Sequence, residues 1–166
     1  MSVFWFLFIY LFIIYIFSNS WRREQQRQVQ TIFSGLGVWS ILALRSPLCG
    51  TDLYSNEGDY FHSFSMMSDY SFAEIIHSAV DSNMEKGWLI YNKLISCITN
   101  DFQVFLAITA GICLILIGFV FYKYSRNVLL SFIVYVSFGL YIFSFSGLRQ
   151  AMALSITFFS YYLLNN

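Results

Sequence analysis

The sequence predicts an all-α, polytopic membrane protein, with about four or five transmembrane helices and a long outer loop that contains short amphipathic helices. Of the 166 residues, 58% are apolar and only 11% are charged, whereas a soluble domain carries about a quarter charged residues. The mean hydropathy is +0.62. The charges also cluster in short segments, which leaves long uncharged runs between them.

The composition excludes several other classes of protein. Aromatic residues make up 21% of the chain and there is a single proline, so neither a disordered chain nor a collagen-like repeat fits. A chain of this length cannot hide so much apolar surface in one soluble core, which argues against an ordinary soluble enzyme. The formal net charge of zero gives no basic field, so we expect no nucleic-acid partner.

The uncharged runs locate the predicted membrane spans, because an ionised group in hydrocarbon costs several kcal/mol and a span needs about 20 apolar residues. The first run lacks the basic start and small-residue cleavage site of a secretory signal, so we interpret it as a retained helix. The last run stops inside a predicted helix, from which we expect a chain truncated at its C-terminus. We predict one transmembrane domain over residues 1–166, with spans at approximately 2–20, 28–44, 102–122, 127–148 and 150–165.

The basic residues predict the orientation of these spans. The turns at 22–28 and 123–126 together hold five Lys and Arg residues against Glu24 alone. The other side holds four basic residues against eight acidic ones, and all eight acidic residues lie in the loop 45–101. Because cytoplasmic turns are enriched in Lys and Arg, we expect the two turns to be cytoplasmic and the loop to lie outside.

The outer loop, residues 45–101, has the pattern of short surface helices. Residues 71–74 form a capping box of the Ser-x-x-Glu type, and residues 82–85 form a second one. Apolar residues with helical spacing follow each box. We therefore predict amphipathic helices near 72–81 and 85–99.

Metal and nucleotide sites are not predicted. The Gly-rich segment 35–40 lacks a phosphate-binding pattern, and the two histidines, His62 and His77, have no zinc-ligand spacing. Cys49 and Cys97 lie on the same predicted side and could pair, but no cysteine has metal-ligand spacing. We expect neither a metal nor another cofactor.

Two arginines carry the clearest chemical signal. Arg45 follows the second predicted span, and Arg149 stands between two apolar runs. A guanidinium binds phosphate with two parallel hydrogen bonds, so two arginines at one membrane face suit a pyrophosphate. The alternative is that both only anchor span ends at the interface, and the residues alone leave the two readings equally weighted.

Three segments give the chain a family resemblance. They are Arg45 with Gly50-Thr51-Asp52, then Lys123-Tyr124-Ser125-Arg126, and then Phe145-Ser146-Gly147-Leu148-Arg149-Gln150-Ala151. With these segments the sequence resembles the EpsG family along essentially the whole chain. These are Wzy-like membrane proteins of bacterial exopolysaccharide and capsule synthesis. Family members are longer, with further spans after the Arg-Gln helix, so the chain resembles an N-terminal half.

The resemblance implies a polymerase of the bacterial cytoplasmic membrane. Its substrate would be oligosaccharide repeat units carried on undecaprenyl diphosphate, and its partners other polysaccharide-assembly membrane proteins. Arg149 and Asp52 would be catalytic, and the substrate would be bound by Arg45, Gln150, Thr51 and His62. Asp52 or His62 would act as the base, although a purely structural turn around Gly50 explains Asp52 equally well. Two other readings stay open, namely a non-catalytic carrier of lipid-linked glycan and an inactive remnant.

Overall fold

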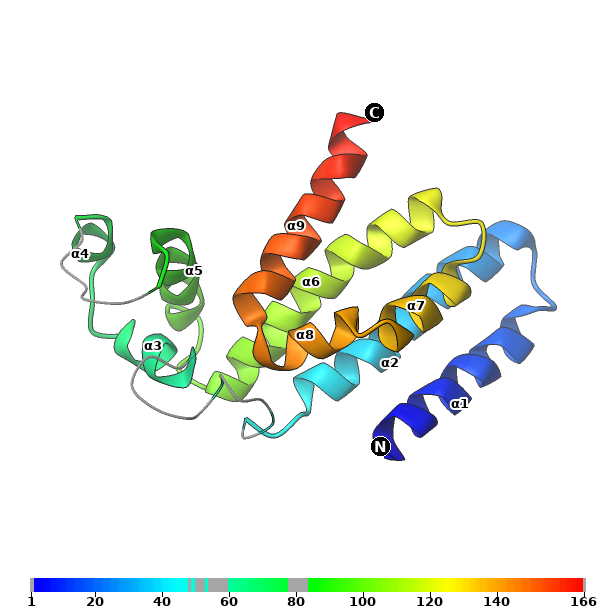
Figure 1. Cartoon of the computed structure of the whole chain (residues 1–166), viewed down its shortest axis with the longest axis horizontal. Coiled ribbons are helices and arrows are strands. Elements are labelled where there is room, and N and C mark those ends of the chain that lie inside the picture. Colours follow the sequence, from blue (N-terminus) through cyan, green and yellow to red (C-terminus); the bar gives the residue numbers. More distant parts are fainter. Residues whose placement is uncertain (1, 48, 50–52, 54–59, 78–83, 166) are drawn as a thin grey trace.

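The computed structural model describes residues 2–47, 49, 53, 60–77 and 84–165. Over these residues the chain is all-helical, with nine helices and no strand, which confirms the predicted all-α class. The helices are α1 (Ser2–Ser18), α2 (Arg23–Ala43), α3 (Tyr60–Met66), α4 (Phe72–Ile76), α5 (Lys86–Ser96), α6 (Phe102–Tyr124), α7 (Val128–Ser137), α8 (Leu140–Ser146) and α9 (Leu148–Leu164) (Figure 1).

Helices α1, α2, α6 and α7 form an antiparallel bundle, and α9 crosses it against α6 (Figure 1). At one end, here called the turn end, α1 connects to α2 and α6 connects to α7. There the Tyr122 hydroxyl donates to Glu24 at 2.5 Å, and Arg27 donates to the carbonyl of Tyr122. The two basic turns of the sequence therefore lie together.

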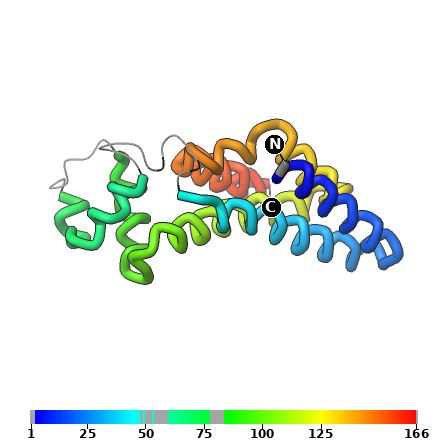
Figure 2. The backbone as a smooth tube through the Cα atoms, turned by 90° about the horizontal axis from the view of Figure 1, so that it is seen from below, coloured from blue at the N-terminus to red at the C-terminus, as the bar shows by residue number. Residues whose placement is uncertain are grey.

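The opposite end, here called the arginine end, is where α2 and α8 finish and α6 and α9 begin. It carries Arg45 and Arg149. Helices α3, α4 and α5, here called the cap, lie beyond this end along the long axis of the molecule in both views (Figures 1 and 2). The described helices of the segment predicted as an outer loop are thus separated from the turn end by the length of the bundle.

Two hydrophobic clusters hold these parts together. The bundle cluster interleaves residues of α1, α2, α6 and α7, among them Leu11, Val38, Leu114 and Phe132. The cap cluster is strongly aromatic, and it joins α3 and α5 to the first turn of α6 and to Leu148 at the start of α9. Its closest ring pair is Phe64 stacked on Phe105, with 4.5 Å between centroids. Both clusters are buried away from solvent, so the cap packs against the arginine end as an extension of the core.

Helix length and composition support membrane spanning for only part of the bundle. Among the described residues, α6 alone is long and apolar enough, and the pair α7 and α8 qualifies only if counted as one bent span. Helix α1 is apolar but shorter. The predicted number of four or five spans therefore stays a prediction.

The span expected over 127–148 is broken in the middle. Helix α7 ends at Ser137 and α8 starts at Leu140, with an angle of 58° between them. Gly139 between them has φ +78°, a left-handed conformation that suits glycine because it lacks a Cβ. Hydrophobicity alone did not predict this break, since the apolar run continues through it.

Helix α2 begins at Arg23, before the predicted span 28–44. Its first turns are polar, and they are stabilised by contacts rather than by hydrophobicity. The buried amide of Gln30 donates to the Ser18 hydroxyl at 2.9 Å, and the Thr31 hydroxyl donates to the Arg27 carbonyl at 2.8 Å. The boundary was predicted from hydropathy, which does not detect a helix that continues into polar sequence.

The cap confirms one of the two predicted capping boxes. The Ser71 hydroxyl accepts from the Glu74 backbone N–H, and Glu74 accepts from the Ser71 N–H at 2.6 Å. Helix α4 is shorter than predicted, ending at Ile76, and the predicted residues 78–81 lie outside the described ones. Helix α5 begins only after Glu85, whose side chain makes no cap hydrogen bond. The helix predicted from residue 85 to 99 therefore extends from Lys86 to Ser96.

The cysteines contribute no cross-link. Cys49 and Cys97 are both exposed and free, and Cys113 is free and buried in α6. The pairing of Cys49 with Cys97 that the sequence left open is not present in the structure.

The contact between α1 and α2 yields a test of the packing. A Cβ on Gly37 would overlap the ring of Tyr10, whereas on Gly35 its nearest neighbour would be a Phe132 ring atom at 3.9 Å. Overpacking costs ~1–3 kcal/mol, while alanine in place of glycine favours a helix by about 1 kcal/mol. We expect Gly37→Ala to lower the thermal midpoint in detergent and Gly35→Ala to keep or raise it. Equal midpoints would mean that α1 does not pack on α2 as described.

Candidate functional site

Arg149 is the second residue of α9, directly after a tight joint between helices. Gly147 is both the C-cap of α8 and the N-cap of α9. A Cβ there would lie 2.7 Å from the Gln150 side-chain oxygen and 3.4 Å from the Phe143 carbonyl, so a larger residue would crowd the joint. Leu148 is buried in the cap cluster and fixes the rotation of the first turn of α9. The Gly-Leu-Arg-Gln sequence thereby directs Arg149 toward the cap.

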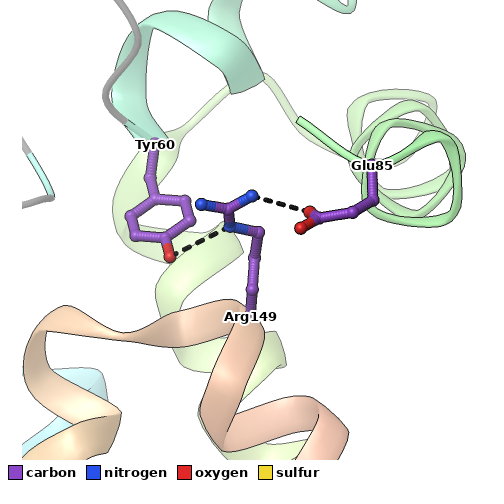
Figure 3. Close-up of polar contacts among 3 residues, drawn as sticks. All are labelled: Tyr60, Glu85 and Arg149. Carbon is purple, nitrogen blue, oxygen red and sulfur yellow. Dashed lines mark hydrogen bonds and ion pairs between the residues drawn. The ribbon is translucent and has the colours of Figure 1, made fainter. Parts of the chain in front are cut away.

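Two residues of the cap region hold the Arg149 guanidinium (Figure 3). Its Nη1 forms an ion pair with Glu85 Oε2 at 2.6 Å, and its Nε donates to the Tyr60 hydroxyl at 3.4 Å. The guanidinium carbon also lies 5.8 Å from the centre of the Tyr60 ring. Tyr60 belongs to α3 and Glu85 directly precedes α5, so Arg149 joins three elements that are distant in sequence.

The ion pair is open to solvent. The Arg149 side chain is 31% exposed and that of Glu85 is 73% exposed. The hydrogen bond with Tyr60, and then that with Glu85, raises the pKa of Arg149. The pKa of Glu85 is lowered first by its own backbone N–H and then by Arg149. Both groups are charged at neutral pH, and an exposed pair of this kind is worth at most about 1 kcal/mol.

Arg45 has a different environment, because it is buried with only 7% of its surface exposed. Its Nη1 donates to the Ser144 carbonyl of α8, and its guanidinium carbon lies 5.3 Å from the centre of the Phe145 ring. Burial lowers the pKa of Arg45 to about 10, so it stays protonated at neutral pH.

The backbone around Arg45 is fixed by Gln103 in the first turn of α6. The Gln103 amide donates to the carbonyl of Arg45 at 3.0 Å and also to that of Ala43. These bonds satisfy carbonyls at the end of α2 that have no partner within the helix. The position of Arg45 is therefore determined by α6 and α8 together.

The remaining predicted residues are distributed as follows. Gln150 is exposed on α9 beside Arg149, and His62 is exposed on α3 two residues after Tyr60. Thr51 and Asp52 lie outside the described residues. Arg45 and Arg149 each have their own partners, on α8 and on the cap respectively. In the described part of the chain, no group of three His, Cys, Asp or Glu residues could hold a metal ion.

The sequence did not identify Tyr60, Glu85 or Gln103 as parts of the site. The sequence pattern places Glu85 in a capping box, whereas its carboxylate pairs with Arg149, which is 64 positions away in the chain. Tyr60 lies 89 positions from Arg149. Only Gln103 had a local signal, since it is a polar residue at the start of a strongly apolar helix.

The exposed ion pair attaches the start of α5 to Arg149 of α9, and hydrogen exchange in α5 can measure this attachment. We expect Glu85→Gln to speed amide hydrogen exchange in α5 by at most about fivefold, because the pair contributes less than about 1 kcal/mol. Lowering the pH through the folded-state pKa of Glu85 should reduce the protection of α5, after correction for the intrinsic pH dependence of exchange, in the parent chain and not in the variant. This follows because a carboxylate with a depressed pKa stabilises the folded state only while it is ionised.

Asp69→Asn is the control, because it removes an exposed carboxylate of the cap whose described partner is the neighbouring Ser68 hydroxyl. Exchange in α5 should not change in this variant. Equal exchange in the Glu85 and Asp69 variants would show that the ion pair does not hold the cap.

Comparison with known proteins agrees with the resemblance. The family model described as the EpsG family matches residues 28–166, which is most of the chain and includes both arginines. No curated protein and no solved structure matches the sequence. The chain therefore belongs to the EpsG family, which associates it with exopolysaccharide biosynthesis at a membrane.

Proposed function

We propose that the chain acts in a polymerase that joins oligosaccharide units carried on undecaprenyl diphosphate, at the outer face of the bacterial cytoplasmic membrane. The observation that carries the proposal is Arg149, a charged and partly exposed guanidinium at the arginine end whose ionic partner is an exposed carboxylate. A phosphate can replace that carboxylate at little cost, since the exposed pair is weak. It would gain the two parallel hydrogen bonds that a guanidinium offers.

The proposed reaction is a glycosyl transfer. A hydroxyl oxygen of the acceptor glycan forms a bond to the anomeric carbon of the donor glycan, while the bond from that carbon to the lipid diphosphate breaks. The bonding electron pair leaves with the diphosphate oxygen, and the hydroxyl proton passes to a base. Arg149 stabilises the negative charge that develops on the diphosphate, because a cation already positioned where the charge develops favours the transition state.

The other residues have supporting roles in this proposal. Asp52 or His62 accepts the proton or orients the acceptor hydroxyl, and Thr51 and Gln150 bind substrate. Tyr60 holds the guanidinium through its hydroxyl and ring, so it is a positioning residue. Asp52 belongs to the proposal through its place in the family motif alone.

The membrane arrangement belongs to the same proposal. The helices that cross or enter the bilayer are α1, α2, α6, the bent pair α7 and α8, and α9. The turn end lies in the cytoplasm. The turn end carries five basic residues against one acidic residue, which fits the positive-inside rule. Helix α1 exposes large apolar side chains along its length, among them Trp5, Phe12 and Phe17, as a lipid-facing helix does.

Thiol labelling of intact cells tests this orientation. The chain offers Cys97 as an exposed reporter near the cap, and Gln25→Cys supplies an exposed reporter at the turn end. Each is used as the only cysteine, with the others changed to serine. We expect a membrane-impermeant maleimide to label Cys97 in intact cells and the residue-25 thiol only after permeabilisation. Labelling of the residue-25 thiol in intact cells would reverse the proposed topology.

Arg149→Lys tests the proposed catalytic role. Lysine keeps the charge and still reaches the interface, but it lacks the planar fork that binds two phosphate oxygens. In the bacterium that encodes the chain, we expect this variant to abolish polymer while the protein stays at near-normal abundance in the membrane.

The matched control is Arg126→Lys, the same change at an exposed arginine of the turn end. Polymer yield should be unchanged in this control. If the Arg149 variant also makes normal polymer, Arg149 is only an interface anchor and its catalytic assignment is wrong.

A further inference from the structure

Arg45 is a buried cation without a counter-charge in the part of the chain that the structure describes. Its partners there are a backbone carbonyl and an aromatic ring, and its Nε is buried with no hydrogen-bond partner. Arg149 is paired with Glu85, but no described carboxylate pairs with Arg45. An isolated buried charge is costly, and such a group normally has an anion or a ligand as its partner.

An apolar groove of about 620 Å³ lies directly beside this guanidinium. Its walls come from the start of α1, the end of α2, and α8. Besides Arg45, the residues that line it include Phe4, Ile41, Leu44, Ile142 and Phe145. Leu44 and Ile142 are also strongly exposed, so the groove opens toward the surface that would face lipid. A positive charge at the end of an apolar groove is complementary to an amphiphile, with an anionic head on Arg45 and a hydrocarbon chain along the groove.

The Arg45 groove and the Arg149 site are separate. Arg149 faces the cap on the α3 and α5 side, whereas Arg45 lies among α1, α2 and α8. Both are at the arginine end, and α8 leads from one to the other, because Ser144 accepts from Arg45 and Arg149 follows shortly after in the chain. Two diphosphate-bearing molecules could therefore occupy the same membrane face at once.

We propose that Arg45 and its groove bind the diphosphate and the adjoining isoprenoid units of a second lipid-linked saccharide. This inference rests on the proposed function, because joining two lipid-linked glycans requires two such molecules at the same face. The Arg149 site takes the lipid diphosphate that leaves, and the Arg45 groove retains the lipid diphosphate that stays attached to the other glycan. Gln103 keeps the Arg45 site in place through the backbone of residues 43 and 45.

The test counts bound ligands on the purified full chain by native mass spectrometry, with undecaprenyl diphosphate as the probe and phosphatidylglycerol as the competitor. The parent chain should bind two equivalents of undecaprenyl diphosphate. Ile142→Trp fills the groove from its exposed side without changing Arg45, and we expect the second equivalent to bind at least tenfold more weakly. Leu130→Trp on α7 is the control, because it adds the same side chain at an equally exposed position that does not line the groove. Leu130 and Ile142 are each 55% exposed. A second variant, Arg45→Gln, should lose the same equivalent.

The outcomes separate this inference from the proposed function. One equivalent in the parent chain, lost in Arg149→Lys and kept in Ile142→Trp, would overturn the inference and leave the proposed function standing. No binding of undecaprenyl diphosphate at all would overturn both. If Ile142→Trp loses bound phosphatidylglycerol and keeps both equivalents of undecaprenyl diphosphate, the inference is overturned, because the groove then holds an ordinary bilayer lipid.

Discussion

Helix α8 is the element on which the positions of both arginines depend. It is a segment of seven residues between Gly139 and Gly147, and it changes direction from α7 by 58°. Tyr141 attaches it to α2, because its fully buried hydroxyl donates to the Val38 carbonyl at 3.1 Å. From that fixed position, α8 offers the Ser144 carbonyl and the Phe145 ring to Arg45, and its last residue leads into α9 and Arg149. A continuous helix through residues 127–148 would lack this change of direction.

The two arginines show how the same side chain acquires different properties from its surroundings. Arg149 is partly exposed, and its carboxylate partner is mostly exposed, so water competes for both groups and exchange of the anion costs little. Arg45 is shielded from water and held by a carbonyl, which leaves its charge without compensation among the described residues. An anion that reaches Arg45 would meet a charge that water screens less than at an exposed guanidinium, because the low dielectric strengthens the attraction. In the proposed function, the Arg149 site is therefore suited to exchange of an anion and the Arg45 site to its retention.

The sequence predicted those features that depend on local patterns. Uncharged runs located the apolar helices, and the Ser71–Glu74 box marked the start of α4. Basic residues predicted that the two short turns are both cytoplasmic. The contact between Tyr122 and Glu24 shows that the turns lie at one end of the bundle, and their side of the membrane stays a prediction. The break at Gly139 was missed because hydropathy does not report backbone conformation. The partners of Arg149 were missed because ion pairs and tyrosine contacts between distant segments leave no periodic signal in one sequence. The same Ser-x-x-Glu pattern predicted a second box at residues 82–85, of which residues 82 and 83 lie outside the described part of the chain, and Glu85 pairs with Arg149 across the fold.

The aromatic cap connects the proposed anion site at Arg149 to the rest of the molecule. Trp88 lies 5.5 Å from Tyr60 and 6.0 Å from Phe105, centroid to centroid, and the Tyr91 hydroxyl lies 2.8 Å from that of Thr109 in α6. These contacts keep α5 packed on α3 and α6 even when Glu85 is not bound to Arg149. A phosphate that displaces Glu85 therefore releases only the first turn of α5, while Tyr60 stays in position to hold the guanidinium. Substrate binding at this site would thus require a local rearrangement of one exposed carboxylate, and not the opening of a buried core.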